Sequence, residues 1–170
     1  MIRHATEADL DDILAIYNHA IEYTTAVFEY RPHTIEMRRE WLRAKQAASL
    51  PVLAAVDSGR VVGFASYGPF RAWPAYKYSV ELSVYVDVNA RGRGVGTSLV
   101  RAILDDARAH EIHVVMAGIT ADNDVSLRLH QRLGFVEVAH IPQVGYKFGQ
   151  WLDLKFLQRM MDGPLRPSEP

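Results

Sequence analysis

The sequence contains no cysteine, and this absence excludes several kinds of chemistry at once. Disulfide frameworks, thiolate nucleophiles and cysteine-ligated metals all need that residue. The seven histidines show no metal-binding spacing either, because none forms an H-x-x-x-H pair or joins a carboxylate cluster. We therefore expect no disulfide and no bound metal, in a chain suited to the reducing cytoplasm.

Long apolar runs and a surplus of either charge are missing as well. No apolar stretch approaches the ~20 residues that cross a bilayer. The opening residues, MIRHATEADLDD, carry acidic side chains where a signal peptide has its apolar core. The 19 lysines and arginines are matched by 20 aspartates and glutamates, for a formal net charge of -1. Neither a membrane nor a nucleic acid is therefore an expected partner.

The composition that is present suits one folded domain. The 170 residues are 49% hydrophobic, which supplies a core. We expect a single domain over residues 1–160. Residues 161–170 are rich in proline and polar side chains, and we expect this tail to fray.

The first half of the chain alternates helix and strand patterns. Thr6 and Asp9 resemble a capping box before a helix whose apolar residues follow helical spacing as far as Ile21. Thr34 is placed to cap a second helix, which ends near residue 48. The segments PVLAAV and VVGFASYG predict a hairpin, and the alternating SVELSVYV predicts a strong strand.

The second half continues the alternation. A glycine-rich loop and an amphipathic helix follow SVELSVYV, and HVVMAGI is then a buried strand. DNDVSLRLHQRLG predicts a short helix closed by Gly134, and FVEVAHI and WLDLKFLQ predict two final strands. Because strands and helices are mixed, with hairpins at both ends, the order predicts an α+β fold around a mixed sheet.

The segment ARGRGVGTS, between strand and helix, has glycine at three alternate positions. A dinucleotide fingerprint needs G-x-G-x-x-G, but the third position holds Thr97 or Leu99. A Walker loop needs a lysine, which this loop lacks. The spacing therefore excludes both nucleotide-binding motifs.

A glycine turn at a helix start can still bind an anion. Its backbone N–H groups and the helix dipole favour negative charge, and Arg91 and Arg93 add charge suited to phosphate. The alternative is a tight turn in which the glycines only allow positive φ. The candidate phosphate-binding residues are Arg91, Gly92, Arg93, Gly94, Val95, Gly96 and Thr97.

This loop resembles a known signature. RGRGVG matches the Q/R-x-x-G-x-G/A pattern of the Gcn5-related N-acetyltransferases, the GNAT family. Downstream, NDVSLRLHQRLGF resembles that family's N-x-x-S/A-x-x-x-Y-x-x-x-G-F segment, with His130 where many members have tyrosine. IYNHAIEYTTAVFEYRP, SVYV, LHQRLGF and GYKFGQWLDL together resemble the phosphinothricin and methionine sulfoximine acetyltransferase branch. The resemblance covers nearly the whole chain, residues 2–158.

The resemblance implies a strongly twisted mixed sheet of about seven strands with flanking helices. It also implies acetyl-CoA as co-substrate, a homodimer, and direct transfer in a ternary complex to the α-amine of a small amino-acid-like substrate. The substrate types of the branch are phosphinothricin, methionine sulfoximine and methionine sulfone. Besides the loop, the acetyl-CoA-binding residues implied are Val84, Tyr85, Val86, Asn123 and Ser126.

Three residues are candidates for proton transfer. Glu81 faces away from Leu82 if its strand alternates, and a carboxylate beside the acetyl group would take the ammonium proton directly or through water. In the branch that the chain resembles, a glutamate at this position is the proposed base; the alternative is an ordinary exposed glutamate. His130 would protonate the departing thiolate, or else it packs against the sheet. Tyr85 is a second, weaker candidate for that acid.

The aromatic segment FRAWPAYKY is expected to hold the substrate. Arg71 suits a bidentate contact with a carboxylate, and the branch has an arginine here. Trp73, with Phe28 from an earlier loop, would wall a small slot; loop packing or a dimer contact is the alternative for Trp73. The predicted substrate-binding residues are Phe28, Arg71, Ala72, Trp73 and Glu81.

Two other functions compete with this one. An acetyltransferase for protein or peptide amines would need an open groove, which the bulky FRAWPAYKY segment disfavours. A non-catalytic acyl-CoA-binding module would keep the glycine loop but has no need of Glu81.

Overall fold

The computed structural model describes residues 1–169, which form two compact units. The first unit comprises Met1–Ser66 and Val84–Ala102, and the second comprises Tyr67–Ser83 and the residues from Ile103 onward. Strands β3 (Arg60–Pro69) and β4 (Ser79–Val86) and helix α3 (Val95–Ala109) contribute residues to both units. The single domain over residues 1–160 stays a prediction.

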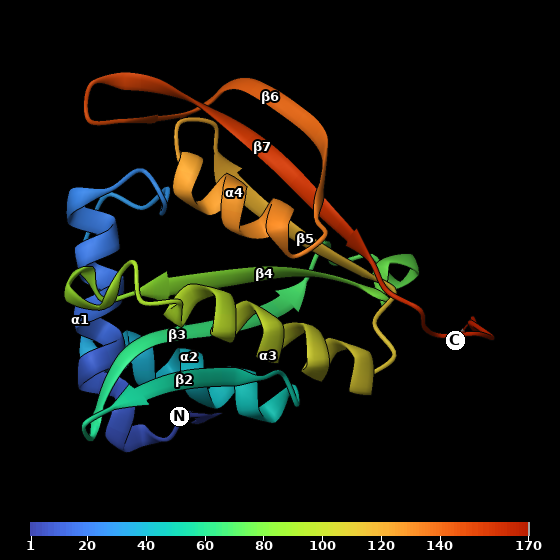
Figure 1. Cartoon of the computed structure of the whole chain (residues 1–170), viewed down its shortest axis with the longest axis horizontal. Coiled ribbons are helices and arrows are strands. Elements are labelled where there is room, and N and C mark those ends of the chain that lie inside the picture. The colour runs from blue at the N-terminus through green and yellow to red at the C-terminus, as the bar shows by residue number, and fades with distance from the viewer. Residues whose placement is uncertain (170) are drawn as a thin grey trace. The chain divides into compact units, whose positions relative to one another are not determined.

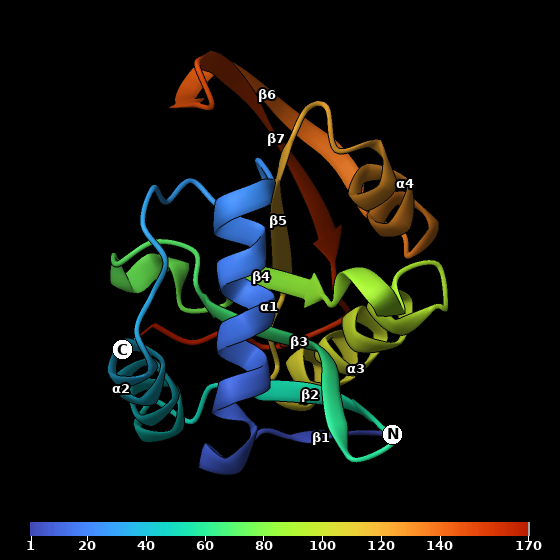
Figure 2. The same ribbon diagram turned by 90° about the vertical axis from the view of Figure 1, so that its left-hand side faces the viewer.

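The first unit contains three antiparallel strands. β1 (Ile2–His4) pairs with β2 (Val52–Asp57), which pairs in turn with β3. Figure 2 shows α1 (Leu10–Tyr23) running across β2 and β3, with α2 (Ile35–Ala47) alongside. Residues two apart on a strand share a face, and one such face packs on these helices. This core consists of Ala5, Leu10, Ile13, Ile16, Leu42, Val52, Ala54, Val61 and Phe64.

Both predicted helix caps are confirmed. Thr6 and Asp9 form a capping box around a short 3₁₀ helix (Glu7–Asp9) that leads into α1. The Asp9 carboxylate also accepts two hydrogen bonds of 2.7 Å from Arg3, which lowers the pKa of Asp9 to about 2. The Thr34 side chain accepts a hydrogen bond of 3.3 Å from the Met37 N–H at the start of α2.

The second unit is built on four strands. β4 runs parallel to β5 (Val114–Thr120), β5 antiparallel to β7 (Gln150–Met160), and β7 antiparallel to β6 (Val136–Lys147). Figure 1 shows β6 and β7 as a long hairpin, with α4 (Asp124–Arg132) between β5 and β6 in the chain. A short 3₁₀ helix (Pro74–Tyr76) lies in the aromatic segment before β4.

The predicted fold class is confirmed. Within residues 1–169, seven strands form one mixed sheet in the order β1-β2-β3-β4-β5-β7-β6, accompanied by four α-helices. Only the length of β6 differs clearly from the prediction, because the strand continues beyond Ile141 through Pro142. A register shift between Ile141 and Gly145 accommodates the proline, as bulges commonly do.

The described part of the tail makes hydrogen bonds within the second unit. Ser168 contacts the Tyr78 hydroxyl, and the Gly163 carbonyl oxygen lies 3.0 Å from His113 Nδ1. Pro170 lies outside the described residues, and the fraying of the tail stays a prediction. In the described part of the chain, no helix has the length and apolarity that crossing a membrane requires.

Candidate active site

The glycine loop lies in the first unit, where a short 3₁₀ helix (Val88–Ala90) links β4 to α3. Gly92 and Gly94 have φ angles of +73° and +80°, in the left-handed region that glycine occupies without steric cost. A Cβ atom built on either glycine would meet no atom within 4 Å. Backbone conformation, rather than lack of space, therefore selects glycine at these two positions.

The start of α3 offers backbone donors to an anion. The N–H of Ser98 donates to the Gly94 carbonyl oxygen at 3.0 Å. The N–H groups of Val95, Gly96 and Thr97 come before this bond, at the helix start, where the helical ladder supplies no acceptor. Donors at the positive end of a helix dipole fit a phosphate group.

Both loop arginines have partners in the first unit. Arg93 Nη2 donates to Asp57 Oδ2 at 3.0 Å, and Arg91 Nε donates to the Val86 carbonyl oxygen at 3.5 Å. Exposed ion pairs such as Arg93–Asp57 contribute about 0–1 kcal/mol, so a phosphate would replace Asp57 at little cost. Sequence reasoning missed Asp57, because it lies 36 residues from Arg93 and no local pattern connects the two.

Strand β4 carries Val84, Tyr85 and Val86, all half-buried, into the first unit. The Tyr85 ring packs against Tyr17 and Phe64, with centroids 5.2 Å apart in each pair. Packing against these two rings explains why position 85 carries a tyrosine side chain. The acetyl-CoA contacts expected of the segment would therefore come from its backbone.

Glu81 lies in the second unit, where its register partner on β5 is Met116. Val80 and Leu82 are buried, whereas Glu81 is half-buried, as the alternation predicted. Among the described residues, its carboxylate has no hydrogen-bond partner. Burial raises the pKa of Glu81, and the Arg71 guanidinium acts in the opposite direction. A half-buried carboxylate with no hydrogen bonds to the protein is suited to accept a proton.

Arg71 is held in place by Phe70. Its guanidinium lies 4.1 Å from the centroid of the Phe70 ring, and its Nη1 donates to the Phe70 carbonyl oxygen at 2.7 Å. The Phe70 ring meets the Phe156 ring of β7 edge to face, with centroids 6.0 Å apart. Arg71 is exposed and forms no ion pair within residues 1–169, so part of its planar fork is available to a carboxylate. Sequence reasoning missed Phe70 and Phe156 as the support of this arginine.

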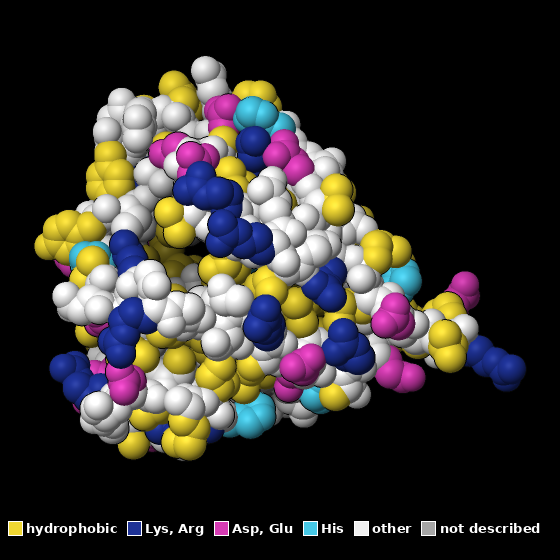
Figure 3. Space-filling model, viewed as in Figure 1, with side chains coloured by type: hydrophobic (Ala, Val, Ile, Leu, Met, Phe, Trp, Pro, Cys, Tyr) yellow, Lys and Arg dark blue, Asp and Glu magenta, His cyan; other side chains and the backbone are white. Residues whose placement is uncertain are grey.

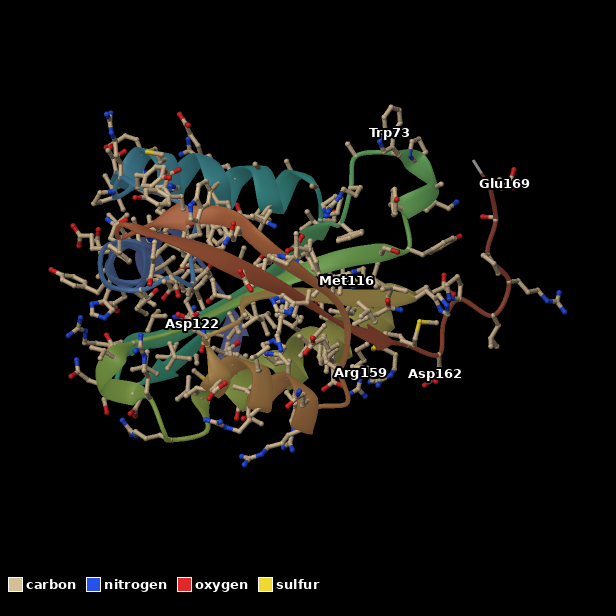
Figure 4. The ribbon with its side chains drawn as sticks, turned by 90° about the horizontal axis from the view of Figure 1, so that it is seen from above. Trp73, Met116, Asp122, Arg159, Asp162 and Glu169 are labelled. Atoms are coloured by element: carbon tan, nitrogen blue, oxygen red, sulfur yellow. The ribbon has the colours of Figure 1, made fainter. Side chains whose placement is uncertain are left out.

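The other predicted substrate residues are exposed. Trp73 is 75% exposed, and Figure 4 shows it at the outer end of the segment between β3 and β4, directed away from the ribbon. Ala72 beside it is exposed too, and Phe28, in the first unit, is 45% exposed. Their role as walls of a substrate slot stays a prediction.

His130 lies on α4 and is 2% exposed, with its ring against Phe135. Its Nδ1 donates to the Ser126 carbonyl oxygen at 2.8 Å, whereas Nε2 is buried and has no partner in the described chain. Burial lowers the pKa of His130, although the Ser126 carbonyl opposes this. Burial, the contact with Phe135 and the lowered pKa favour the packing alternative, and the acid role stays a prediction.

Asn123 and Ser126 meet each other at the start of α4. The Asn123 side-chain oxygen accepts a hydrogen bond of 3.2 Å from the Ser126 N–H, which makes Asn123 the N-cap of the helix. Asparagine before a helical pattern is an N-cap signal that the sequence reading did not use. Contact of either residue with acetyl-CoA stays a prediction. No group of three or more His, Asp or Glu side chains that could hold a metal occurs in residues 1–169.

Comparisons with known proteins identify the family of the chain. A model of the acetyltransferase (GNAT) family matches residues 13–135, which include Glu81 and the glycine loop. The chain belongs to the acetyltransferase (GNAT) family. It is 45% identical over 162 residues to an L-methionine sulfoximine/L-methionine sulfone acetyltransferase of Pseudomonas paraeruginosa, with 95% of this chain and 94% of the relative covered.

Two further comparisons support the GNAT assignment. A phosphinothricin N-acetyltransferase of Streptomyces coelicolor is 38% identical over 161 residues, with 93% of this chain and 94% of the relative covered. The solved structure of the Salmonella typhimurium acetyltransferase yncA with its cofactor acetyl-CoA has a TM-score of 0.96 and 42% identity, with 99% of this chain and 97% of that chain covered. The resemblance drawn from the sequence motifs is confirmed.

Proposed function

We propose that this GNAT enzyme transfers the acetyl group of acetyl-CoA to the α-amine of a small amino-acid-like substrate. The candidates are methionine sulfoximine, methionine sulfone and phosphinothricin, the compounds in its relatives' names. One observation carries the proposal: in the second unit, the half-buried carboxylate of Glu81 accepts no hydrogen bond from the described residues, and the exposed guanidinium of Arg71 forms no ion pair with them. A carboxylate that takes a proton from an amine and a guanidinium that pairs with a carboxylate together fit an amino acid as substrate.

In this reaction Glu81 takes a proton from the substrate ammonium group. The amine nitrogen then bonds to the acetyl carbon of the thioester, a backbone N–H of the Val84–Val86 segment stabilises the oxyanion, and the C–S bond breaks. Nitrogen loses its second proton, and the CoA thiolate is protonated. Because a thiol has a pKa near ~8.5, the thiolate leaves without much help from an acid such as His130.

Glu81 and Val84 are three residues apart on strand β4. The phosphates of acetyl-CoA would lie on the loop that follows β4, against the N–H groups of Gly94–Thr97 and the side chains of Arg91 and Arg93.

The β6–β7 hairpin supports a homodimer as the working form. Large apolar side chains are exposed along both strands and the turn: Val136, Val138, Ile141, Val144, Tyr146, Phe148 and Trp151. Exposed apolar patches of this kind typically mark interaction surfaces. Sedimentation should find wild type as a dimer and Trp151→Glu as a folded monomer. A monomeric wild type would contradict this part of the proposal.

Nucleic acid is not proposed as a partner. Lys and Arg side chains lie in separate groups among acidic and uncharged ones on the face drawn in Figure 3, and the formal net charge is -1. A cytoplasmic location is proposed from the cysteine-free composition.

The proposed function is tested by measuring thiol release. Acetyl-CoA is mixed with the protein and, separately, with methionine sulfoximine, methionine sulfone, phosphinothricin or a peptide with a free N-terminus. We expect rapid release of free CoA with at least one of the three amino acids and little with the peptide. Preferential turnover of the peptide would favour the protein-amine alternative. Binding of acetyl-CoA without release in any mixture would favour the non-catalytic module.

A further inference from the structure

Gly118 of β5 lies beside Glu81 in the second unit, and its backbone does not require glycine. Its φ is not among the positive values of the chain, so alanine would fit the same conformation. Glycine inside a strand costs roughly 0.5–1 kcal/mol relative to alanine. The flanking residues Ala117 and Ile119 are buried, whereas Gly118 is exposed. The reason for glycine therefore has to be sought in the space beside it.

A neighbouring carboxylate takes up that space. A Cβ atom added to Gly118 would lie 2.9 Å from Glu81 Oε1, closer than real Cβ atoms approach other heavy atoms. The next nearest atoms would be Phe156 Cε1 at 3.4 Å and Leu154 Cδ1 at 3.8 Å, both ordinary contact distances. Any side chain at position 118 thus competes with the Glu81 carboxylate before it meets anything else.

The carboxylate is also the group that would give way. It lies at the end of a flexible side chain and has no hydrogen-bond partner in the described chain. Phe156, by contrast, is held by its edge-to-face contact with Phe70. A small side chain at position 118 would therefore move the Glu81 carboxylate and leave the fold intact.

We propose that Gly118 is a positioning residue for Glu81: by lacking a side chain, it leaves the space in which the carboxylate stands, at an exposed position of β5. This inference rests on the proposed function, because it assumes that Glu81 is the base. Proton transfer and attack are sensitive to placement, and a shift of about 1 Å can cost a hundredfold in rate. Position 118 then controls turnover without contributing any reacting group.

The test compares Gly118→Ala with wild type at saturating acetyl-CoA and methionine sulfone. We expect kcat to fall roughly ten- to a hundredfold. The KM for acetyl-CoA should not rise. The melting temperature should not fall, because alanine suits a strand better than glycine. The low-pH limb of the kcat profile should also move, since the displaced carboxylate changes its burial and its distance from Arg71. Gly163→Ala is the matched control, because its Cβ would meet nothing closer than 3.8 Å; its kcat should equal that of wild type.

A double mutant decides whether Gly118 acts through Glu81. In the Glu81→Gln background, Gly118→Ala should cost less than about twofold, because no base remains to be displaced. An unchanged kcat for Gly118→Ala, or a full additional loss in the Glu81→Gln background, would overturn the inference while leaving the proposed function standing. A wild type without any thiol release would instead refute the proposed function.

Discussion

In the glycine loop, the groups expected to hold a ligand are mainly backbone N–H groups of one continuous segment, residues 92–97. Around Glu81, the groups come from separate segments: Arg71 before β4, Gly118 on β5 and Phe156 on β7. A backbone site tolerates many side chains but depends on a few φ angles. A side-chain site depends on the type of each residue. We therefore expect the two regions to fail differently when they are mutated.

The largest expected effect lies at the side-chain site and concerns the substrate carboxylate. The bound substrate would bury its carboxylate against Arg71, so in Arg71→Ala that buried carboxylate would lose its partner at a cost of ~2–4 kcal/mol, which is roughly thirty- to a thousandfold in kcat/KM. Arg71→Lys should recover only part, because lysine lacks the planar fork. The control is a matched amine without a carboxylate, for which neither variant should matter. Equal losses on both substrates would assign Arg71 to the fold or to acetyl-CoA binding.

Glu81→Gln should lower kcat by ~10², the usual contribution of a general base. In wild type, activity is lost as the pH falls through the pKa of Glu81, which burial holds above that of an ordinary glutamate. At high pH the amine loses its own proton, so the difference between the variant and wild type should shrink as the pH rises. Rates measured from acidic to alkaline pH check this. A loss that is the same at every pH would mean that Glu81 only positions the substrate.

The glycine loop should bind CoA more weakly when a φ angle in it is strained. Gly94→Val would force a branched side chain into a φ of +80°, which costs about 1–2 kcal/mol for residues other than glycine. If the loop relaxes to avoid that strain, CoA should bind roughly five- to thirtyfold more weakly by calorimetry. Gly59→Val is the matched control, because Gly59 has a φ of +81° and equally free surroundings in the turn between β2 and β3. Equal CoA affinity in the two variants would remove the loop from the acetyl-CoA site.

The smallest effect is expected at His130. His130→Phe should lower kcat by less than about tenfold, because thiolate is a good leaving group at neutral pH. Burial also lowers the pKa of His130, which makes the protonated ring harder to form. Steady-state measurements of kcat in His130→Phe and Glu81→Gln check which substitution costs more. A larger loss in His130→Phe than in Glu81→Gln would reverse the roles assigned to the two residues.

Sequence reasoning predicted the features that depend on neighbours in the chain. The capping box of Thr6 and Asp9, the cap at Thr34 and the alternation around Glu81 each involve residues a few positions apart. The glycine loop belongs to the same class, because its φ requirements leave a direct trace in the sequence. The continuation of β6 through Pro142 was not predicted, because the register shift that accommodates the proline arises from pairing with β7.

The surroundings of Glu81 were predictable only in part. Arg71 and Glu81 lie close together in the sequence, and their chemistry could be anticipated. Gly118 lies beside Glu81 through the pairing of β4 with β5, and Phe156 lies opposite Gly118 through the pairing of β5 with β7. That register is set by tertiary packing, and no local pattern encodes which residues it brings together.

The most direct test of the difference between the two regions measures CoA affinity and kcat in Gly94→Val and Glu81→Gln side by side. The account predicts a separation: Gly94→Val weakens CoA binding and leaves kcat at saturating acetyl-CoA near that of wild type. Glu81→Gln lowers kcat and leaves CoA affinity unchanged. If Glu81→Gln weakens CoA binding as much as Gly94→Val does, or if Gly94→Val lowers kcat as much as Glu81→Gln, the division between a backbone site for acetyl-CoA and a side-chain site for the acceptor is contradicted.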